Sequence, residues 1–214
     1  MKILNLYAGI GGNRKLWGNE HDITAVEIDP EIAKVYSDYF PDDKMVIGDA
    51  HQYLLDHFKE FDFIWSSTPC PSHSRANYWA SFGKNRKITY PDMSLYQEVI
   101  LLRNYARRAM WVVENVVPYY NPLIPAVEVD RHLFWSNFSI WSRNSLPKTK
   151  PFNMMTNGDW EEYYGFDLSV YRMPKKLKVL RNCVHPETGL YILECATGAI
   201  KSKTEQGNLF EATP

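Results

Sequence analysis

Short apolar runs alternate with helix-like segments through the first half of this chain, and the alternation limits the fold more than any other feature of the sequence. Such an alternation is typical of a parallel sheet whose strands are joined by covering helices. The apolar runs predict strands at residues 3–7, 23–28, 45–47, 61–66 and 109–114. The intervening patterns predict helices at residues 13–19, 30–40, 50–58 and 94–108. We therefore expect an α/β fold with a doubly wound, mostly parallel sheet.

The second half of the chain has a different pattern. Residues 127–135 and 138–141 are rich in β-forming side chains, and residues 143–178 are irregular, with prolines, glycines and many aromatic residues. A last helix is predicted at about residues 189–199, and residues 201–214 form a polar tail. We expect a small second lobe or an elaborate insertion, followed by a flexible tail.

The composition limits the class of protein. The 214 residues are 45% hydrophobic and 23% charged, which excludes intrinsic disorder and small disulfide-stapled scaffolds. The 3 cysteines are an odd number and favour a reducing compartment. No apolar run is long enough to span a bilayer, and the first residues turn glycine-rich before a signal-peptide core forms. We therefore expect a soluble cytoplasmic protein, monomeric by default.

The charges are unevenly distributed although the formal net charge is only −1. Twelve acidic and three basic residues lie between Glu20 and Asp62, whereas seven basic and two acidic residues lie between Phe63 and Met110. A further run without acidic residues contains Arg172, Lys175, Lys176, Lys178 and Arg181. One part of the chain is therefore suited to a polyanion, although solvated lysines are the simpler interpretation of the last run.

The first predicted strand runs into a glycine-rich turn, Tyr7-Ala8-Gly9-Ile10-Gly11-Gly12. Glycines at a first strand-to-helix turn let the backbone bend tightly and approach a ligand closely. The second strand ends at Glu27-Ile28-Asp29, where a carboxylate can hold ribose hydroxyls, and the third ends at Gly48-Asp49-Ala50, where another can take an exocyclic amine. Together these segments favour an adenosine-containing cofactor.

A cysteine held between two prolines, Pro69-Cys70-Pro71, follows the fourth predicted strand. This rigid loop presents its thiol at the carboxyl edge of the sheet, where ligands bind in such folds. The fifth strand ends in Glu114-Asn115-Val116, which places a carboxylate beside the thiol if the two strands are neighbours. A nucleophile next to an acid indicates covalent catalysis with proton delivery.

With its motifs in this order, the sequence resembles the DNA cytosine-5 methyltransferases, as a compact bacterial or phage-like member. The glycine turn, Glu27, Asp49, Pro69-Cys70 and Glu114-Asn115-Val116 match successive motifs of that family. Between Pro69-Cys70 and Glu114, the segment Leu95-Tyr96-Gln97-Glu98 with Arg103 resembles the family's helix motif. The family's closing motif resembles Arg181-Asn182-Cys183-Val184-His185-Pro186. The match spans Leu4 to about Ala199.

The resemblance implies a Rossmann-like S-adenosylmethionine-dependent methyltransferase fold and methyl transfer to C5 of a flipped cytosine. It implies that the Cys70 thiolate adds to C6, that Glu114 binds N3 and the exocyclic amine, and that no metal is required. It also implies catalytic roles for Asn115 and Arg131. The residues implied to hold the cofactor are Tyr7, Ala8, Gly9, Ile10, Gly11, Gly12, Glu27, Ile28, Asp49, Ala50, Pro69, Asn182 and Cys183.

The resemblance also divides the chain by function. Residues 1–141 would form the catalytic domain, residues 142–180 a reduced target-recognition region, and residues 181–200 the closing motif with a helix that returns to the catalytic domain. The residues implied to contact double-stranded DNA are Ser72, Ser74, Arg75, Lys84, Arg86, Lys175 and Lys176. The short recognition region indicates loose recognition or help from another protein.

Several positions depart from the family pattern. Arg131 resembles one arginine of the family's Arg-x-Arg motif, but the second is absent, with His132 nearby, so the group that holds the cytosine O2 is not identified. Arg181 and His185 replace a glycine and a proline of the closing motif. His73 replaces a large apolar residue and is expected to be solvated or hydrogen-bonded. The aromatic residues of the recognition region form either a DNA-stacking surface or a small core.

The tail contains Gln206-Gly207-Asn208-Leu209-Phe210, which resembles the peptides by which bacterial replication proteins dock on the sliding clamp. Exposed apolar side chains in a polar tail need a binding partner or a surface to pack on. The motif predicts clamp binding through Gln206, Leu209 and Phe210, and the alternative is that Leu209 and Phe210 pack back on the domain.

Three other functions are weighed against DNA methylation. A tRNA cytosine-5 methyltransferase has the same scaffold, because the motifs specify a flipped pyrimidine and not its sugar. A non-catalytic DNA-binding relic is disfavoured by the intact Cys70 and Glu114, and a dehydrogenase would leave both without a role. A zinc site at Cys183, Cys195 and His185 is disfavoured because their spacing matches no usual pattern.

Overall fold

The computed structural model describes residues 1–83, 88–141, 143, 146 and 150–200. Its centre is a 7-stranded sheet with the strand order β3-β2-β1-β4-β5-β7-β6. The strands are β1 (Lys2–Leu6), β2 (Asp22–Glu27), β3 (Lys44–Ile47), β4 (Phe63–Ser67), β5 (Met110–Val116), β6 (Val127–Val129) and β7 (His132–Ser136). The first five strands pair in parallel, and the β6–β7 hairpin joins β5 antiparallel. The expected α/β, mostly parallel sheet is therefore confirmed.

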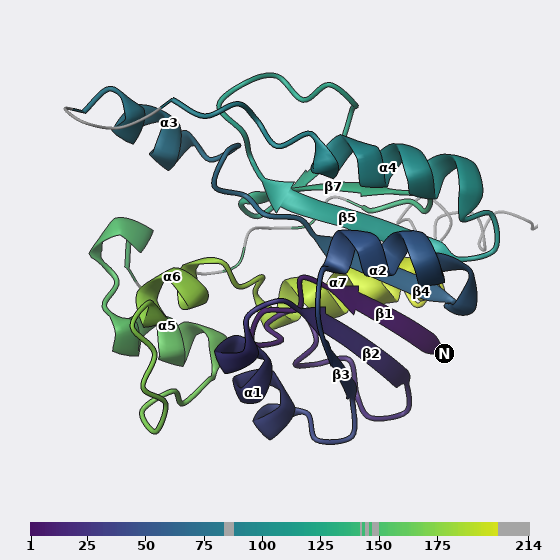
Figure 1. Ribbon diagram of the computed structural model, residues 1–214, viewed down its shortest axis with the longest axis horizontal. Coiled ribbons are helices and arrows are strands. Elements are labelled where there is room, and N and C mark those ends of the chain that lie inside the picture. Colours follow the sequence, from purple (N-terminus) through teal and green to yellow (C-terminus); the bar gives the residue numbers. More distant parts are fainter. Residues whose placement is uncertain (84–87, 142, 144–145, 147–149, 201–214) are drawn as a thin grey trace, which may run out of the picture.

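Helices cover both faces of the sheet (Figure 1). They are α1 (Pro30–Tyr39), α2 (Ala50–His57), α3 (Arg75–Ser81), α4 (Ser94–Tyr105), α5 (Asn157–Tyr164), α6 (Lys176–Arg181) and α7 (Pro186–Thr197), with 3-10 turns η1 (Phe58–Glu60) and η2 (Phe152–Met154). Helices α2 and α4 pack on the face formed by Leu4, Ile64 and Val113, and α7 packs on the face formed by Ile3, Phe63 and Val112. None of the helices in the described part of the chain combines the length and apolarity needed to cross a membrane.

Two strand-end aspartates begin the helices that follow them. Asp29 caps α1 by accepting hydrogen bonds from the backbone N–H groups of Glu31 and Ile32. Asp49 caps α2 in the same way, with the N–H groups of His51 and Gln52. These caps satisfy backbone donors that a helix start otherwise leaves unpaired, which is why both helices begin where the sequence predicts. The Asp49 carboxylate thus has a structural use.

The helix expected at residues 13–19 is absent, and that prediction is wrong. The segment forms turns that place Trp17 against the rings of Phe63 and Trp65, at 6.2 and 5.7 Å between centroids. Gly12 and Gly18 bracket a stretch shorter than two helical turns, and Gly18 has a φ of +80°. Burial of Trp17 in the core therefore outweighs the weak helical propensity of so short a stretch.

The second half is more helical than the sequence predicts. No strand forms at residues 138–141, and the irregular region contains α5 and α6. Buried Trp160 and Tyr164 of α5 pack with Phe166, Leu168 and other apolar side chains into a small core that also includes Ile10 and Val35. The aromatic residues of this region, which we call the α5–α6 lobe (residues 150–181), therefore form a core and attach it to the turn after β1.

Candidate active site

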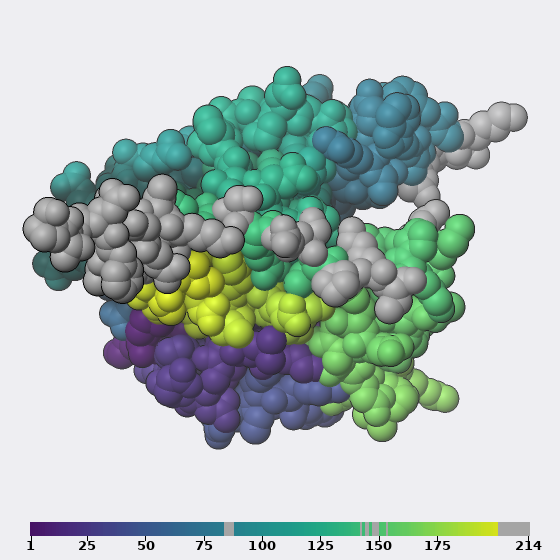
Figure 2. Space-filling view, turned by 180° about the vertical axis from the view of Figure 1, so that it is seen from behind, coloured from purple at the N-terminus to yellow at the C-terminus, as the bar shows by residue number. Residues whose placement is uncertain are grey.

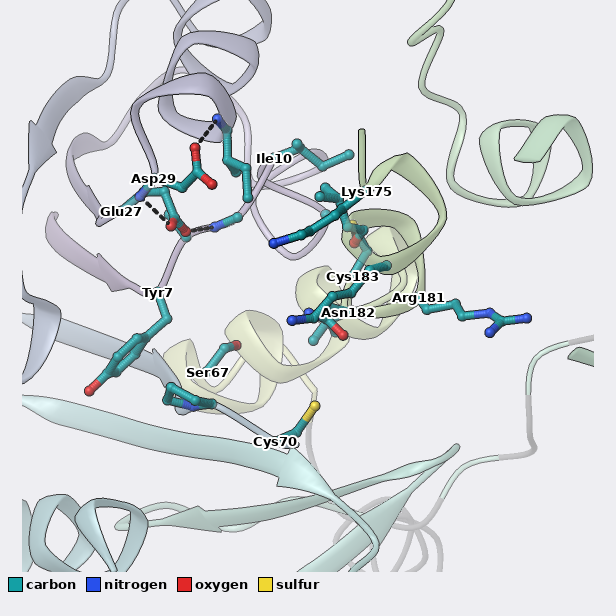
Figure 3. A pocket seen from close by; sticks show the side chains of 18 of the residues that line it. Tyr7, Ile10, Glu27, Asp29, Ser67, Cys70, Lys175, Arg181, Asn182 and Cys183 are labelled. Carbon is teal, nitrogen blue, oxygen red and sulfur yellow. Dashed lines mark hydrogen bonds between the residues drawn. The ribbon is translucent and has the colours of Figure 1, made fainter. Parts of the chain in front are cut away.

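A cavity of about 490 Å³ lies at the carboxyl edge of the parallel strands (Figure 3). Its volume is in the usual range for a small-molecule site. The turn after β1, the end of β2, the loop after β4, the end of β5 and residues 173–184 all contribute to its wall. The predicted site residues that line it are Tyr7, Ala8, Gly9, Ile10, Gly12, Glu27, Ile28, Pro69, Cys70, Glu114, Lys175, Asn182 and Cys183.

Other predicted residues lie outside the cavity lining in the described part of the chain. These are Gly11, Asp49, Ala50, Ser72, Ser74, Arg75, Asn115, Arg131 and Lys176. Lys84, Arg86, Gln206, Leu209 and Phe210 lie outside the described residues. The cavity is also lined by His132, Lys178 and Val116, for which the sequence predicted no contact with the cofactor or the base.

Glu27 holds the glycine turn in place. Its Oε2 accepts a hydrogen bond from Gly9 N at 2.9 Å, and its Oε1 accepts from Ile28 N and Asp29 N at 2.9 and 3.0 Å. A carboxylate has about four acceptor positions, so one remains for a ligand hydroxyl. Glu27 therefore fixes the turn and still presents an acceptor to the cavity.

Two glycines of the turn have different tasks. A Cβ on Gly9 would have no heavy atom within 4 Å, so this position, at a φ of +57°, opens toward the cavity. A Cβ on Gly12 would lie 2.5 Å from the backbone oxygen of Val184, which is too close for any side chain. Gly9 therefore leaves room for a ligand, and Gly12 lets the closing segment pack on the turn.

Cys70 is half-buried, and its thiol faces the cavity. Burial, and next the nearby Glu114 carboxylate, raise the pKa of the thiol to about 11, while the positive charges of Arg131 and Lys178 oppose this rise. The sulfur is therefore protonated at neutral pH, and a reaction that needs the thiolate must remove that proton.

Asn115 positions the thiol loop. Its side chain lies on the opposite face of β5 from Glu114, as expected for neighbours on a strand. The Nδ2 of Asn115 donates to both the backbone oxygen and the hydroxyl oxygen of Thr68, each at 2.9 Å. His73, later in the loop, is buried, and its Nδ1 lies 2.6 Å from the Tyr120 hydroxyl, as a hydrogen-bonded histidine was expected to do.

Glu114 is a buried acid at the end of β5. It lies opposite Ser67 in the β4–β5 register, and the Ser67 hydroxyl donates to its carboxylate. Trp65 Nε1 in turn donates to Ser67 Oγ at 2.8 Å. Burial raises the pKa of Glu114 to about 7 despite the Ser67 hydrogen bond and the charge of Arg131. The carboxyl can therefore hold or release a proton near neutral pH.

This raised pKa predicts a pH-dependent stability. Unfolded Glu114 titrates near 4.5 and folded Glu114 near 7, so the folded chain holds the extra proton and loses stability as the pH rises through this interval. Glu114→Gln mimics the protonated carboxyl. Between about pH 4.5 and about pH 8, the wild type should therefore lose on the order of 3 kcal/mol of unfolding free energy relative to Glu114→Gln. Urea unfolding of both proteins measures this loss, and a pH-independent difference contradicts it.

Arg131 lies beside the site but is turned into the α5–α6 lobe. Its Nη2 donates to the Tyr164 hydroxyl, to Arg181 O and to Cys183 O at 3.1, 2.7 and 3.2 Å. Its guanidinium also lies over the rings of Phe152 and Trp160. The side chain is therefore engaged in joining the β6–β7 hairpin to the lobe and to the closing segment.

Several predicted DNA-contacting side chains also have partners within the protein. Lys176 Nζ donates to Leu168 O at 2.5 Å and lies 3.7 Å from Glu161 Oε1. Arg75 Nε donates to Pro118 O at 3.0 Å. Lys175 instead extends into the cavity, whereas the guanidinium of Arg181 extends away from it (Figure 3). Lys178 also lines the wall. Positive charge therefore gathers at the α6 side of the cavity.

Comparisons with known proteins give two kinds of match. The family model for C-5 cytosine-specific DNA methylases matches residues 1–119. The solved methyltransferase EhMeth of Entamoeba histolytica aligns with a TM-score of 0.56 at 10% identity, covering 94% of this chain and 99% of that chain. A DNMT2 mutant from Spodoptera frugiperda aligns with a TM-score of 0.36 at 26% identity, covering 54% of this chain and 35% of that chain. No curated protein matches significantly.

Proposed function

Because the chain belongs to the C-5 cytosine-specific DNA methylase family, whose cofactor is S-adenosylmethionine, we propose that it methylates C5 of cytosine in double-stranded DNA. The observation that carries the proposal is that Cys70, Glu114 and the glycine turn face one cavity. This is the arrangement that a nucleophile, an acid and a methyl donor need in order to act on one base. In a duplex, the cytosine must be flipped out to reach the thiol.

The cavity fits the cofactor. Gly9 opens a space that a Cβ would fill, and Glu27 retains one acceptor for a ribose hydroxyl. Ile28, which is largely exposed, offers apolar surface, and Asn182 closes the opposite wall. When bound, S-adenosylmethionine supplies an electrophilic methyl group. Asp49, which its place at a strand end predicted to take an exocyclic amine, caps α2 and does not line the cavity.

The two catalytic side chains divide the chemistry between them. The Cys70 thiol gives its proton to solvent water, and its sulfur bonds to C6 of the base, which makes C5 nucleophilic. Glu114, with a pKa of about 7, donates a proton to N3 and so stabilises the charge that this attack develops. After C5 is methylated, its proton leaves to solvent water, the bond between sulfur and C6 breaks, and N3 returns its proton to Glu114. Cys70 is thereby regenerated.

Two projections of the protein would contact the DNA. The helix α3 has no buried residue, and Trp79 and Phe82 at its end are 70% and 69% exposed. Figure 2 shows a hollow between α3, in blue, and the α5–α6 lobe, in green. We assign the duplex to this hollow, with Lys175 and Lys178 toward its phosphates. Because the aromatic residues of the lobe form a core, few are left to contact DNA. The recognised DNA sequence would therefore be short, or recognition would be assisted by another protein.

A methylation map tests the proposal. The protein is incubated with S-adenosylmethionine and unmethylated DNA of mixed sequence, and 5-methylcytosine is mapped by bisulfite sequencing beside a Cys70→Ala control. Cys70-dependent conversion in a fixed sequence context supports a DNA methyltransferase. Competition between duplex DNA and tRNA separates the DNA enzyme from the tRNA alternative on the same scaffold. No conversion of either substrate, with no adduct on 5-fluorocytosine DNA, would mean a non-catalytic relic.

Removal of the Glu27 carboxylate should weaken cofactor binding. Glu27→Ala frees three backbone N–H groups and the turn they hold. We expect the dissociation constant of S-adenosylmethionine to rise about 10- to 100-fold. Titration calorimetry measures this change, with Glu128→Ala as the control because Glu128 is exposed on β6. An unchanged constant in Glu27→Ala removes Glu27 from the cofactor site.

We also propose, from the sequence of the tail alone, that Gln206, Leu209 and Phe210 dock on a bacterial sliding clamp. A polar chain end carrying one Leu-Phe pair suits a small apolar pocket on a partner. The test is binding of the full chain to an immobilised sliding clamp, with Leu209→Ala plus Phe210→Ala as the variant. Equal binding by the wild type and the variant contradicts the assignment.

A further inference from the structure

The β6–β7 hairpin places a histidine beside the catalytic acid. In the β5–β7 register, His132 lies opposite Val116, and Glu114 lies opposite Phe134. These side chains share one face of the sheet, so His132 and Glu114 are diagonal neighbours. The His132 Nε2 lies 3.7 Å from Glu114 Oε1, and His132 lines the same cavity as Cys70.

His132 has one N–H group available to a ligand. Its side chain is 5% exposed, and its buried Nδ1 has no hydrogen-bond partner. A proton on Nδ1 would therefore face no acceptor, whereas a proton on Nε2 faces the cavity and Glu114. At 3.7 Å the Glu114 carboxyl is too distant for a hydrogen bond, so it does not occupy this donor. Burial lowers the pKa of His132 to about 3, which keeps the imidazole neutral.

The chemistry of the pyrimidine ring decides what such a donor meets. N3 of cytosine lies between C2, which carries a carbonyl oxygen, and C4, which carries an amino group. A side chain next to the acid that binds N3 therefore meets either the carbonyl oxygen on C2, which is an acceptor, or the amino group on C4, which is a donor. An N–H group can pair only with the carbonyl oxygen. Among the described residues nearby, Arg131 is committed to Tyr164, Arg181 and Cys183.

We propose that His132 contacts the flipped base, with its Nε2–H donating a hydrogen bond to the 2-carbonyl oxygen of the cytosine. This inference rests on the proposed function and names a further residue of the same site. The contact adds a second point of recognition beside Glu114, and it fixes the ring so that C6 faces the Cys70 sulfur. A uracil or cytosine offers this oxygen equally, so His132 orients the base and Glu114 distinguishes it.

The test is a cycle of protein variant and base analogue. The rate of methyl transfer is measured on DNA whose target is cytosine or 2-thiocytosine, in which a poor sulfur acceptor replaces the carbonyl oxygen. For the wild type, we expect kcat/KM to fall about tenfold on the thio base. For His132→Phe, the two bases should react within about twofold of each other, both slowly, while S-adenosylmethionine affinity is unchanged. A tenfold loss in both proteins overturns the inference.

Two amide variants guard against a merely structural effect. The amide nitrogen of Gln reaches the position of Nε2, whereas that of Asn reaches the position of Nδ1. His132→Gln should therefore retain the tenfold fall in kcat/KM on 2-thiocytosine, which we call the thio penalty. His132→Asn should lose it. His73→Phe removes another buried histidine, one that does not line the cavity, and should retain the penalty. If His132→Asn retains the penalty, the inference is wrong. If the wild type methylates neither base in DNA nor in tRNA, the proposed function fails instead.

Discussion

Replacement of Cys70 by alanine is expected to lower methyl transfer by about 10³-fold or more while S-adenosylmethionine affinity stays within about twofold. In the proposed mechanism the sulfur forms the bond to C6, and the methyl group of alanine cannot. The other 2 cysteines are buried, with raised thiol pKa values, so neither replaces Cys70 as the nucleophile. The cofactor contacts proposed for Glu27 and the glycine turn do not involve the thiol, so binding should persist.

The reaction on DNA containing 5-fluorocytosine measures the bond directly. Fluorine at C5 blocks the elimination that normally releases the protein, so the wild type should accumulate a covalent adduct that survives denaturation. Cys70→Ala should form none. Cys195→Ala, which alters a buried cysteine in α7, should form as much adduct as the wild type. An adduct with Cys70→Ala would overturn the nucleophile assignment.

Replacement of Arg14 by methionine is expected to destabilise the protein by about 3–5 kcal/mol. Arg14 and Asp43 form a bidentate pair, with Nε–Oδ2 at 2.8 Å and Nη2–Oδ1 at 3.1 Å, and both side chains are 3% exposed. The Tyr36 hydroxyl also donates to Asp43 Oδ2 at 2.7 Å. Loss of the guanidinium leaves the Asp43 carboxylate buried with one neutral donor, which is the main cost.

Urea unfolding at neutral pH measures this loss. The double variant Arg14→Met plus Asp43→Asn removes the unpaired charge and should recover more than half of the lost free energy. Lys34→Met breaks an exposed ion pair with Asp38 on the surface of α1 and serves as the control, with little expected change. If Arg14→Met alone costs less than about 1 kcal/mol, the pair does not hold the turn region together.

The strands of the first half follow from the sequence because β1, β2, β4 and β5 contain apolar runs that are buried on both faces of the sheet, whereas the edge strand β3 is a short apolar run that is only partly buried. Their predicted positions agree with β1 to β5 within about two residues, which is normal for element ends. The helix expected at residues 13–19 failed because Trp17 gains more from the core than the segment gains from helical bonds. Tertiary packing of this kind leaves no local signal.

In the site, too, some residues could be placed from local sequence signals and others depend on tertiary structure. Cys70 and Glu114 could be placed because strand ends of a parallel sheet meet at one edge. His132 could not be placed, because its position depends on the antiparallel register of β7 against β5. His132 lies 16 residues after Val116, and the sequence between them does not reveal that register. Arg131 was assigned to the base from its motif, yet its guanidinium lies against the α5–α6 lobe.

The cavity is assembled from segments that lie far apart in the sequence. Its glycine turn comes from residues 7–12, and its opposite wall comes from residues 173–184, which pack against Gly12 through Val184. During synthesis, the cavity therefore stays incomplete until residues 173–184 have emerged from the ribosome. Cofactor binding then couples the turn after β1 to residues 173–184 and stabilises only the fold in which both are in place. S-adenosylmethionine binding thus depends on two segments that lie more than 160 residues apart in the sequence.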